Sequence, residues 1–249
     1  MFEPEYPIRT ERLLIRPYAA GDVDALYAYQ RLPEVHRYLY TEPRTRAEVQ
    51  TMVAERAGAR SPTGAGQAFQ LVAELADTGE RVGDCVLFWH SEEHAQGEIG
   101  YVLNPAYHGR GLATEVAAAL LRLGFEGLGL HRITGRLDAR NAASARVLER
   151  IGLRREAHLV QNEFVKGEWT DELIYAILRA EWEARLPPGC THPPGGGPGA
   201  GRPPGAVRPT ARPDGRRSSR RPGRWTSSRN GRGGGAIRPR RRPSSASRS

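Results

Sequence analysis

One segment, Glu98 to Phe125, constrains the fold more than any other part of the chain. It reads EIGYVLNPAYHGRGLATEVAAALLRLGF, which predicts a strand, a sharp turn and a helix that opens on HGRGLA. Glycines at 109 and 111 let the backbone N–H groups at the helix start turn toward one point. These groups have no partner inside the helix, and the helix dipole adds positive charge there. The segment therefore predicts a site for a phosphate or a diphosphate.

Two common phosphate loops do not fit this segment. A dinucleotide fingerprint needs a third small residue, where this chain has Thr114, and an acidic residue about twenty positions later. A nucleoside-triphosphate loop needs GxxxxGK followed by Ser or Thr, and the chain has one lysine, Lys166, outside any such string. The remaining alternative is a glycine turn that only joins a strand to a helix.

The string HGRGLA closely resembles the acyl-coenzyme A diphosphate loop of the GNAT N-acetyltransferase superfamily, with His108 where Gln or Arg is usual. Three more segments resemble the ribosomal-protein N-terminal (RimJ/RimL-type) branch of that superfamily, in the expected order: Thr10–Leu39, Asn141–Leu153 and Asp171–Trp182. The resemblance implies an enzyme that moves an acetyl group from acetyl-CoA to a primary amine, with the α-amine of a protein or peptide N-terminus as the favoured acceptor. A small amine or an antibiotic is the alternative acceptor.

The resemblance also implies which residues bind acetyl-CoA. The loop amides would hold the diphosphate, the strand before the loop would pair with the pantetheine amides, and Asn141 would lie against the cofactor arm. The implied set is Tyr101, Val102, Leu103, His108, Gly109, Arg110, Gly111, Leu112, Ala113, Thr114 and Asn141. The alternative for Asn141 is a helix N-cap alone. No metal is expected, because the seven histidines show no metal-ligand spacing.

Two residues are candidates for the chemistry. Glu98 is the candidate general base, on the strand face opposite Tyr101, and its alternative is a solvated strand carboxylate. Ser144 lies on the inward stripe of its predicted helix, and the resemblance places it near the coenzyme sulfur, while a satisfied core hydroxyl is its alternative. Many superfamily members carry a tyrosine acid where this chain has Leu148, so we expect Ser144 to take that place.

Composition divides the chain into two parts. Residues 187–249 carry 15 arginines and one acid, a net charge of about +14, so the net charge of +9 for the whole chain leaves about −5 for residues 1–186. The second part is mostly Gly, Pro, Arg and Ser and has too little apolar surface to offset ordering entropy. We therefore expect an acetyltransferase domain at 1–186 and a disordered tail at 187–249.

Hydrophobic periodicity predicts an α/β (α+β) fold with a mixed sheet covered by helices. The resemblance implies the same layout, with a mostly antiparallel sheet, helices on both faces and a splayed central strand pair. The expected strands are 11–16, 67–75, 82–89, 98–104, 132–137, 153–160 and 173–178, and the expected helices start at 22, 45, 109 and 141. Asp22 is expected to cap the first helix, Cys85 to lie in the core, and the loop 60–66 with the first two helices to shape the acceptor pocket. The segment MFEPEYPIRTE is unlike a signal peptide and no run spans a membrane, so a cytoplasmic location is expected.

The arginine-rich tail raises a second class of function. Such a tail binds nucleic acid by counterion release without reading sequence, and it would tether the enzyme to ribosomes. The alternative is a passive extension of an arginine-biased sequence, since arginine outnumbers lysine 36 to one. A catalytically idle acyl-CoA-binding protein is a third possibility, kept open by His108 and Leu148. Nothing in the sequence distinguishes a monomer from a dimer.

Overall fold

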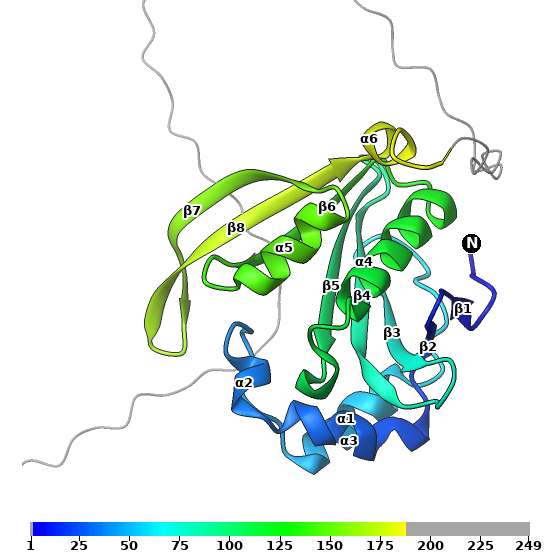
Figure 1. Ribbon diagram of the computed structural model, residues 1–249, viewed down its shortest axis with the longest axis vertical. Coiled ribbons are helices and arrows are strands. Elements are labelled where there is room, and N and C mark those ends of the chain that lie inside the picture. Colours follow the sequence, from blue (N-terminus) through cyan, green and yellow to red (C-terminus); the bar gives the residue numbers. More distant parts are fainter. Residues whose placement is uncertain (1, 188–249) are drawn as a thin grey trace, which may run out of the picture. The chain divides into compact units, whose positions relative to one another are not determined.

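The computed structural model describes residues 2–187, which form one sheet with helices on its faces (Figure 1). The strands are β1 (Ile8–Arg9), β2 (Leu13–Pro17), β3 (Ala68–Leu75), β4 (Arg81–Ser91), β5 (Gln96–Leu103), β6 (Arg132–Asp138), β7 (Arg154–Val165) and β8 (Glu168–Leu178). The α-helices are α1 (Val23–Gln30), α2 (Pro33–His36), α3 (Arg46–Arg56), α4 (Leu112–Arg122), α5 (Ala142–Arg150) and α6 (Arg179–Glu183). Single turns η1 (Ala20–Asp22) and η2 (Pro105–Tyr107) are 3₁₀, and η3 (Leu123–Gly127) is a π-turn that extends α4.

The sheet is parted at its centre. Its strand order is β1-β2-β3-β4-β5-β6-β8-β7, and every neighbouring pair is antiparallel except β5 and β6. The parallel pair is joined only at Gln96–Glu98, whereas β5 stays paired with β4 as far as Leu103. Residues 99–103 therefore leave one backbone edge without a partner strand. This is the splayed central pair that the sequence predicts.

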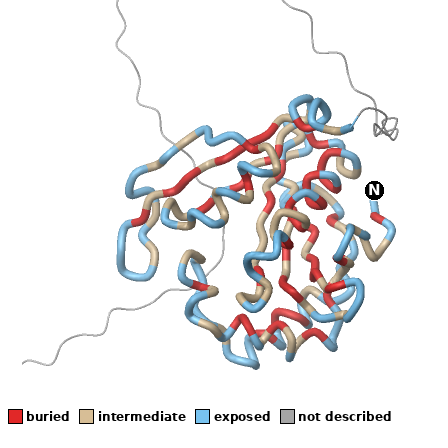
Figure 2. Tube along the Cα trace, viewed as in Figure 1, coloured by how far each residue is buried: buried red, intermediate tan, exposed pale blue. Residues whose placement is uncertain are grey.

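Each face of the sheet carries its own core, so the prediction of helices on both faces is confirmed. On one face, α4 and α5 pack through residues such as Leu112, Val116 and Leu148. On the other face, α1 and α3 pack through Leu26, Tyr29 and their neighbours. Figure 2 shows the buried segments running along the central strands and the inner sides of these helices.

Helix α4 forms because its sequence combines strong helix formers with a helical apolar stripe. LATEVAAALLR is rich in Ala and Leu, and Leu112, Val116 and Leu120 recur every four residues on the buried side. Cys85 is buried, as predicted, while Cys190 and the predicted disordered tail lie outside the described residues. No helix between residues 2 and 187 is long and apolar enough to cross a membrane.

Asp22 does not cap α1, and this part of the sequence interpretation is wrong. Its carboxylate makes no cap hydrogen bond with the helix. It is fully buried and accepts hydrogen bonds from both Arg16 terminal nitrogens (2.9 and 2.8 Å), Arg81 Nε (3.0 Å) and the Ala19 amide (2.8 Å). Two guanidinium groups outweigh burial and hold the pKa of Asp22 below its ordinary value. The charge ties β2 to β4 instead of starting a helix.

Four features extend beyond the sequence expectations: strand β1, helices α2 and α6, and the full length of the β7–β8 hairpin. The hairpin turns at Lys166 and Gly167, which both have positive φ (53° and 85°), with Val165 opposite Glu168. This is the backbone of a two-residue turn in which Asn or Asp usually precedes Gly, so a lysine hides the signal. The hairpin consequently projects well past the predicted strand ends at 160 and 173 (Figure 1).

Candidate active site

The predicted diphosphate loop forms a cradle of backbone amides at the start of α4. Gly109 and Gly111 take left-handed conformations, with φ of 74° and 78°, and α4 begins at Leu112. The amide N–H groups from Gly109 to Ala113 donate to no acceptor among the described residues. Five adjacent free donors at a helix N-terminus are suited to a diphosphate, which supplies several anionic oxygens.

Arginine 12, in the bend just before β2, braces this cradle. Its Nη1 donates to the Arg110 carbonyl at 2.9 Å, and its Nε donates to Glu115 Oε2 at 2.8 Å. Thr10 also donates to Glu115, at 2.5 Å. Burial opposes the charge of Glu115, but the bonds from Thr10 and Arg12 outweigh it and lower the pKa of that carboxyl. The loop is thus held by a side-chain network that leaves its amides free.

The residues predicted to bind acetyl-CoA differ in where their side chains lie. Leu112 is buried, the ring of His108 lies 3.1 Å (Nε2) from the Leu103 carbonyl, and Thr114 Oγ1 is buried with no partner in the described part of the chain. Along β5, Tyr101 and Leu103 pack toward α4 and α5, whereas Val102 packs toward α1 and α3. The part of β5 that remains free for a ligand is therefore its unpaired backbone edge.

Asparagine 141, Ser144 and Tyr101 meet beside the parted strands. Asn141 is the N-cap of α5, where its Oδ1 accepts from the Ser144 amide at 3.1 Å. The hydroxyl oxygens of Tyr101 and Ser144 are 3.0 Å apart. Burial raises the pKa of Tyr101 to about 12, against a smaller lowering by the Ser144 bond.

Leucine 148 is a packing residue. It is 2% exposed, and a methyl group added at Gly135 would come within about 3 Å of its side chain. The glycine on β6 makes room for this leucine, so the position at which the resemblance implies a tyrosine acid in many superfamily members is filled by the core.

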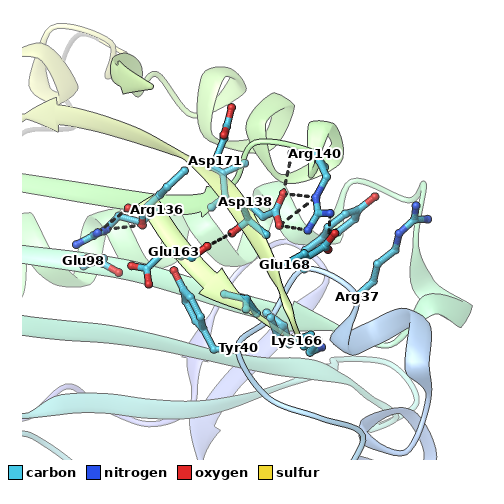
Figure 3. A pocket seen from close by; sticks show the side chains of 16 residues that line it. Arg37, Tyr40, Glu98, Arg136, Asp138, Arg140, Glu163, Lys166, Glu168 and Asp171 are labelled. Carbon is cyan, nitrogen blue, oxygen red and sulfur yellow. Dashed lines mark hydrogen bonds and ion pairs between the residues drawn. The ribbon is translucent and has the colours of Figure 1, made fainter. Parts of the chain in front are cut away.

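Glu98 lines a cavity of about 490 Å³ (Figure 3). Its side chain is 24% exposed, and Oε2 lies 3.3 Å from His90 Nε2. The walls come from the segment after α2, from β5 and β6, and from the β7–β8 hairpin: Arg37, Tyr38, Leu39, Tyr40, Arg136, Leu137, Asp138, Arg140, Glu163, Val165, Lys166, Glu168, Thr170, Asp171 and Glu172. Because side chains alternate along a strand, this cavity and the Tyr101–Ser144 pair lie on opposite faces of β5.

Carboxylates outnumber cations in this cavity, six to four. Most are paired: Arg136 holds Glu172 through two hydrogen bonds (2.8 and 2.7 Å), and Arg140 holds Asp138 and Glu168 (both 2.7 Å). Asp171 lies 2.7 Å from His158, and Glu98 lies 3.3 Å from His90. Glu163 is the exception. Glu163 has only a long 3.5 Å contact with Asn162 within residues 2–187. The side chains that line the cavity therefore carry an excess of negative charge.

The loop 60–66 and the helices α1 and α3 contribute no lining residue to this cavity, whose walls are residues 37–40 and the hairpin. That this loop and these helices shape the acceptor pocket stays a prediction. Lys166 joins those two walls, because its ammonium donates to the His36 carbonyl. Tyr175 is a core residue whose hydroxyl donates to Glu149 at 2.9 Å. Within the described range no three His, Cys, Asp or Glu residues gather as metal ligands.

Comparisons of sequence and of structure with known proteins all find similarity to acetyltransferases. The profile of the Acetyltransferase (GNAT) domain matches residues 12–154. The Uncharacterized N-acetyltransferase YnaD of Bacillus subtilis (strain 168) is 35% identical over 175 residues, which cover 70% of this chain and 98% of the relative. A solved GNAT-family acetyltransferase from Bacillus anthracis is 34% identical with a TM-score of 0.63, covering 73% of this chain and 100% of that one.

Two relatives whose names state an acceptor match over shorter stretches. The Spermidine N(1)-acetyltransferase of Escherichia coli (strain K12) is 26% identical over 106 residues, 43% of this chain and 57% of the relative. The Putative ribosomal N-acetyltransferase YdaF of Bacillus subtilis (strain 168) is 33% identical over 111 residues, 45% of this chain and 61% of the relative. The two names point to different acceptors.

Proposed function

The chain belongs to the GNAT acetyltransferase family and is an acyltransferase, and from this premise we propose that it moves the acetyl group of acetyl-CoA to a primary amine. One observation carries the proposal. The free edge of β5 runs from the amide cradle at Gly109 to Glu98, which opens into an acidic cavity on the other face. A diphosphate held at the cradle leaves the acyl end of the molecule to lie along β5 toward that cavity.

The chain's own groups supply three parts of the reaction. The cradle amides and the free edge of β5 anchor and align the acyl donor, which by proximity alone contributes several kcal/mol. Glu98 accepts the proton that the amine must lose. Ser144 faces the leaving sulfur. Acetyl-CoA supplies the activated thioester.

The preferred acceptor is the α-amine of a peptide or protein N-terminus. Such an amine has a pKa near 8, so its deprotonation at pH 7 costs about 1.4 kcal/mol, whereas a lysine amine near 10.4 costs about 4–5 kcal/mol. A single carboxylate as base suits the smaller cost. The test is a screen that follows thiol release from acetyl-CoA against short peptides, the same peptides with blocked N-termini, and small amines.

We expect release with free N-termini and none with blocked ones. Tight acetyl-CoA binding without release to any acceptor would favour an idle acyl-CoA-binding protein instead. Deleting residues 188–249 is expected to leave transfer unchanged, and any nucleic-acid contact of that segment stays a prediction.

Gly109→Val tests the cradle. A β-branched residue is strained at a φ of 74°, so the loop should move to a right-handed conformation and turn its amides away. We expect acetyl-CoA affinity, measured by calorimetry, to fall at least tenfold. Gly129→Val is the matched control, because Gly129 lies beyond the other end of α4 with a φ of 68° and, like Gly109, has no atom within 4 Å of an added Cβ. Equal affinity losses in the two variants would contradict the cradle assignment.

A polyamine is the second candidate acceptor, favoured by the excess of carboxylates in the cavity. Glu163 has no cationic partner among the described residues and lines the cavity together with Glu98. For Glu163→Gln we expect KM for spermidine to rise about fivefold, because one charged contact is lost, while KM for an N-terminal peptide changes less than twofold. No acetylation of spermidine by the wild-type protein would eliminate this candidate.

A further inference from the structure

The Tyr101 hydroxyl is hydrogen-bonded to Ser144, a residue on another element of the fold. Its hydroxyl oxygen lies 3.0 Å from Ser144 Oγ and 3.4 Å from the Ser144 carbonyl oxygen. The two residues come from β5 and from the first turn of α5, where β6 has already parted from β5. The pair therefore lies beside the open edge along which the acyl donor is proposed to bind.

Hydrogen-bond inventory allows Ser144 to contact Tyr101 and a ligand at once. A phenol has one O–H to donate, and a serine hydroxyl has one O–H and two acceptor sites. Either hydroxyl can donate across the 3.0 Å contact, and Ser144 Oγ has no other hydrogen-bond partner among residues 2–187. When the Ser144 O–H donates to a bound ligand, its Oγ can therefore accept the hydrogen of Tyr101.

We propose that Tyr101 is a positioning residue: its phenol holds Ser144 so that the serine O–H points at the sulfur that leaves coenzyme A. This inference rests on the proposed function. It adds a side-chain role for Tyr101, whose backbone alone was implicated by the sequence. It also explains how a serine replaces the tyrosine acid, since the space at Leu148 is filled by the core.

The phenol acts as a donor of a hydrogen bond and not of a proton. Burial raises its pKa to about 12, whereas a thiol titrates near 8.5. Proton transfer from Tyr101 to a thiolate is therefore disfavoured by about 3,000-fold. A hydrogen bond to an anion is roughly twice as strong as one to a neutral group, so the Ser144 O–H strengthens its contact as charge develops on sulfur.

The step balances without any further reactant. The amine nitrogen forms a bond to the thioester carbonyl carbon, the carbon–sulfur bond breaks, and its electron pair stays on sulfur. The proton lost by nitrogen passes to Glu98. The thiolate leaves with the Ser144 hydrogen bond and takes up a proton from solvent.

The test is a double-mutant cycle on kcat. Tyr101→Phe and Ser144→Ala should each lower kcat about tenfold, and the double variant should be no slower than Ser144→Ala alone, because Tyr101 acts through Ser144. KM for both substrates and the affinity for acetyl-CoA should change less than twofold. The pH profile of kcat should keep its shape in Tyr101→Phe, since no proton leaves the phenol.

Tyr175→Phe is the matched control. Tyr175 is a buried tyrosine whose hydroxyl donates to Glu149, away from Ser144, and its loss should leave kcat unchanged. Multiplicative losses in the double variant, or an unchanged kcat in Tyr101→Phe, would overturn the inference while wild-type transfer persists. Absence of transfer by the wild-type protein to every amine would instead refute the proposed function.

Discussion

Replacing Glu98 with glutamine is expected to lower kcat for a peptide acceptor about 100-fold at pH 7, because a positioned general base contributes about 10²–10⁴ in rate. Glutamine keeps the size of the side chain, which is 24% exposed and lies 3.3 Å from His90, but it cannot accept the proton. Acetyl-CoA affinity should stay unchanged, since the cradle lies at the other end of the β5 edge. Steady-state kinetics with calorimetry on the same preparation measures both quantities.

The pH dependence makes this result specific to proton transfer. An α-amine loses its proton without help near pH 8, so the deficit of Glu98→Gln should shrink as the pH rises from 6 to 9. Glu93→Gln is a suitable control, because Glu93 is an exposed residue in the β4–β5 turn outside the cavity. A deficit that stays constant with pH would remove Glu98 from the role of base.

Replacing Asp22 with alanine is expected to lower the free energy of unfolding by about 3 kcal/mol. Removing one partner of a buried ion pair typically costs about 3–5 kcal/mol, and the lower end applies because Arg16 keeps Glu74 at 2.6 Å. Urea denaturation measures the change. Asp24→Ala is the control two residues away, since the Asp24–Arg46 pair is exposed and should contribute less than about 1 kcal/mol.

Acid should change the stability of the wild-type protein and that of Asp22→Ala differently. The pKa of Asp22 is lowered in the folded state, because the arginines outweigh burial, so its stabilisation is present above the ordinary aspartate value near 3.9 and is lost as pH falls through the lower folded value. Stability of the wild-type protein should therefore fall more steeply below pH 4 than that of Asp22→Ala. Parallel curves of unfolding free energy against pH would show that the arginines do not lower the pKa of Asp22.

The part of the site that lies within one stretch of sequence could be predicted. Strand β5, the two glycines and α4 are consecutive, and their signals are local: alternation, positive-φ residues and a helical stripe. The Asn141 cap and the inward position of Ser144 follow from helix spacing in the same way. The roles of these residues in acetyl-CoA binding and catalysis stay predictions.

The cavity at Glu98 could not be predicted, because its walls meet only through folding. Residues 37–40 follow a four-residue helix, and the hairpin turns on Lys166 and Gly167, so neither has a strong local signal. The prediction that Asp22 caps α1 was wrong for a related reason. An aspartate before a helix resembles a cap, but Arg16 and Arg81 reach Asp22 from strands that are 6 and 59 residues away in the sequence. Long-range charge pairing overrode a local preference.

The three residue pairs that join β5 to β6 make this sheet two half-sheets with a narrow seam. A ligand that lies in the gap and bonds to the free edge of β5 would serve as a missing strand between the halves. Ligand binding would then join the two half-sheets and stabilise the folded domain. At a ligand concentration 100 times Kd, binding would raise the free energy of unfolding by about 2.7 kcal/mol. In this architecture the sheet of the unliganded protein would be interrupted at its centre, and a bound substrate would bridge the interruption.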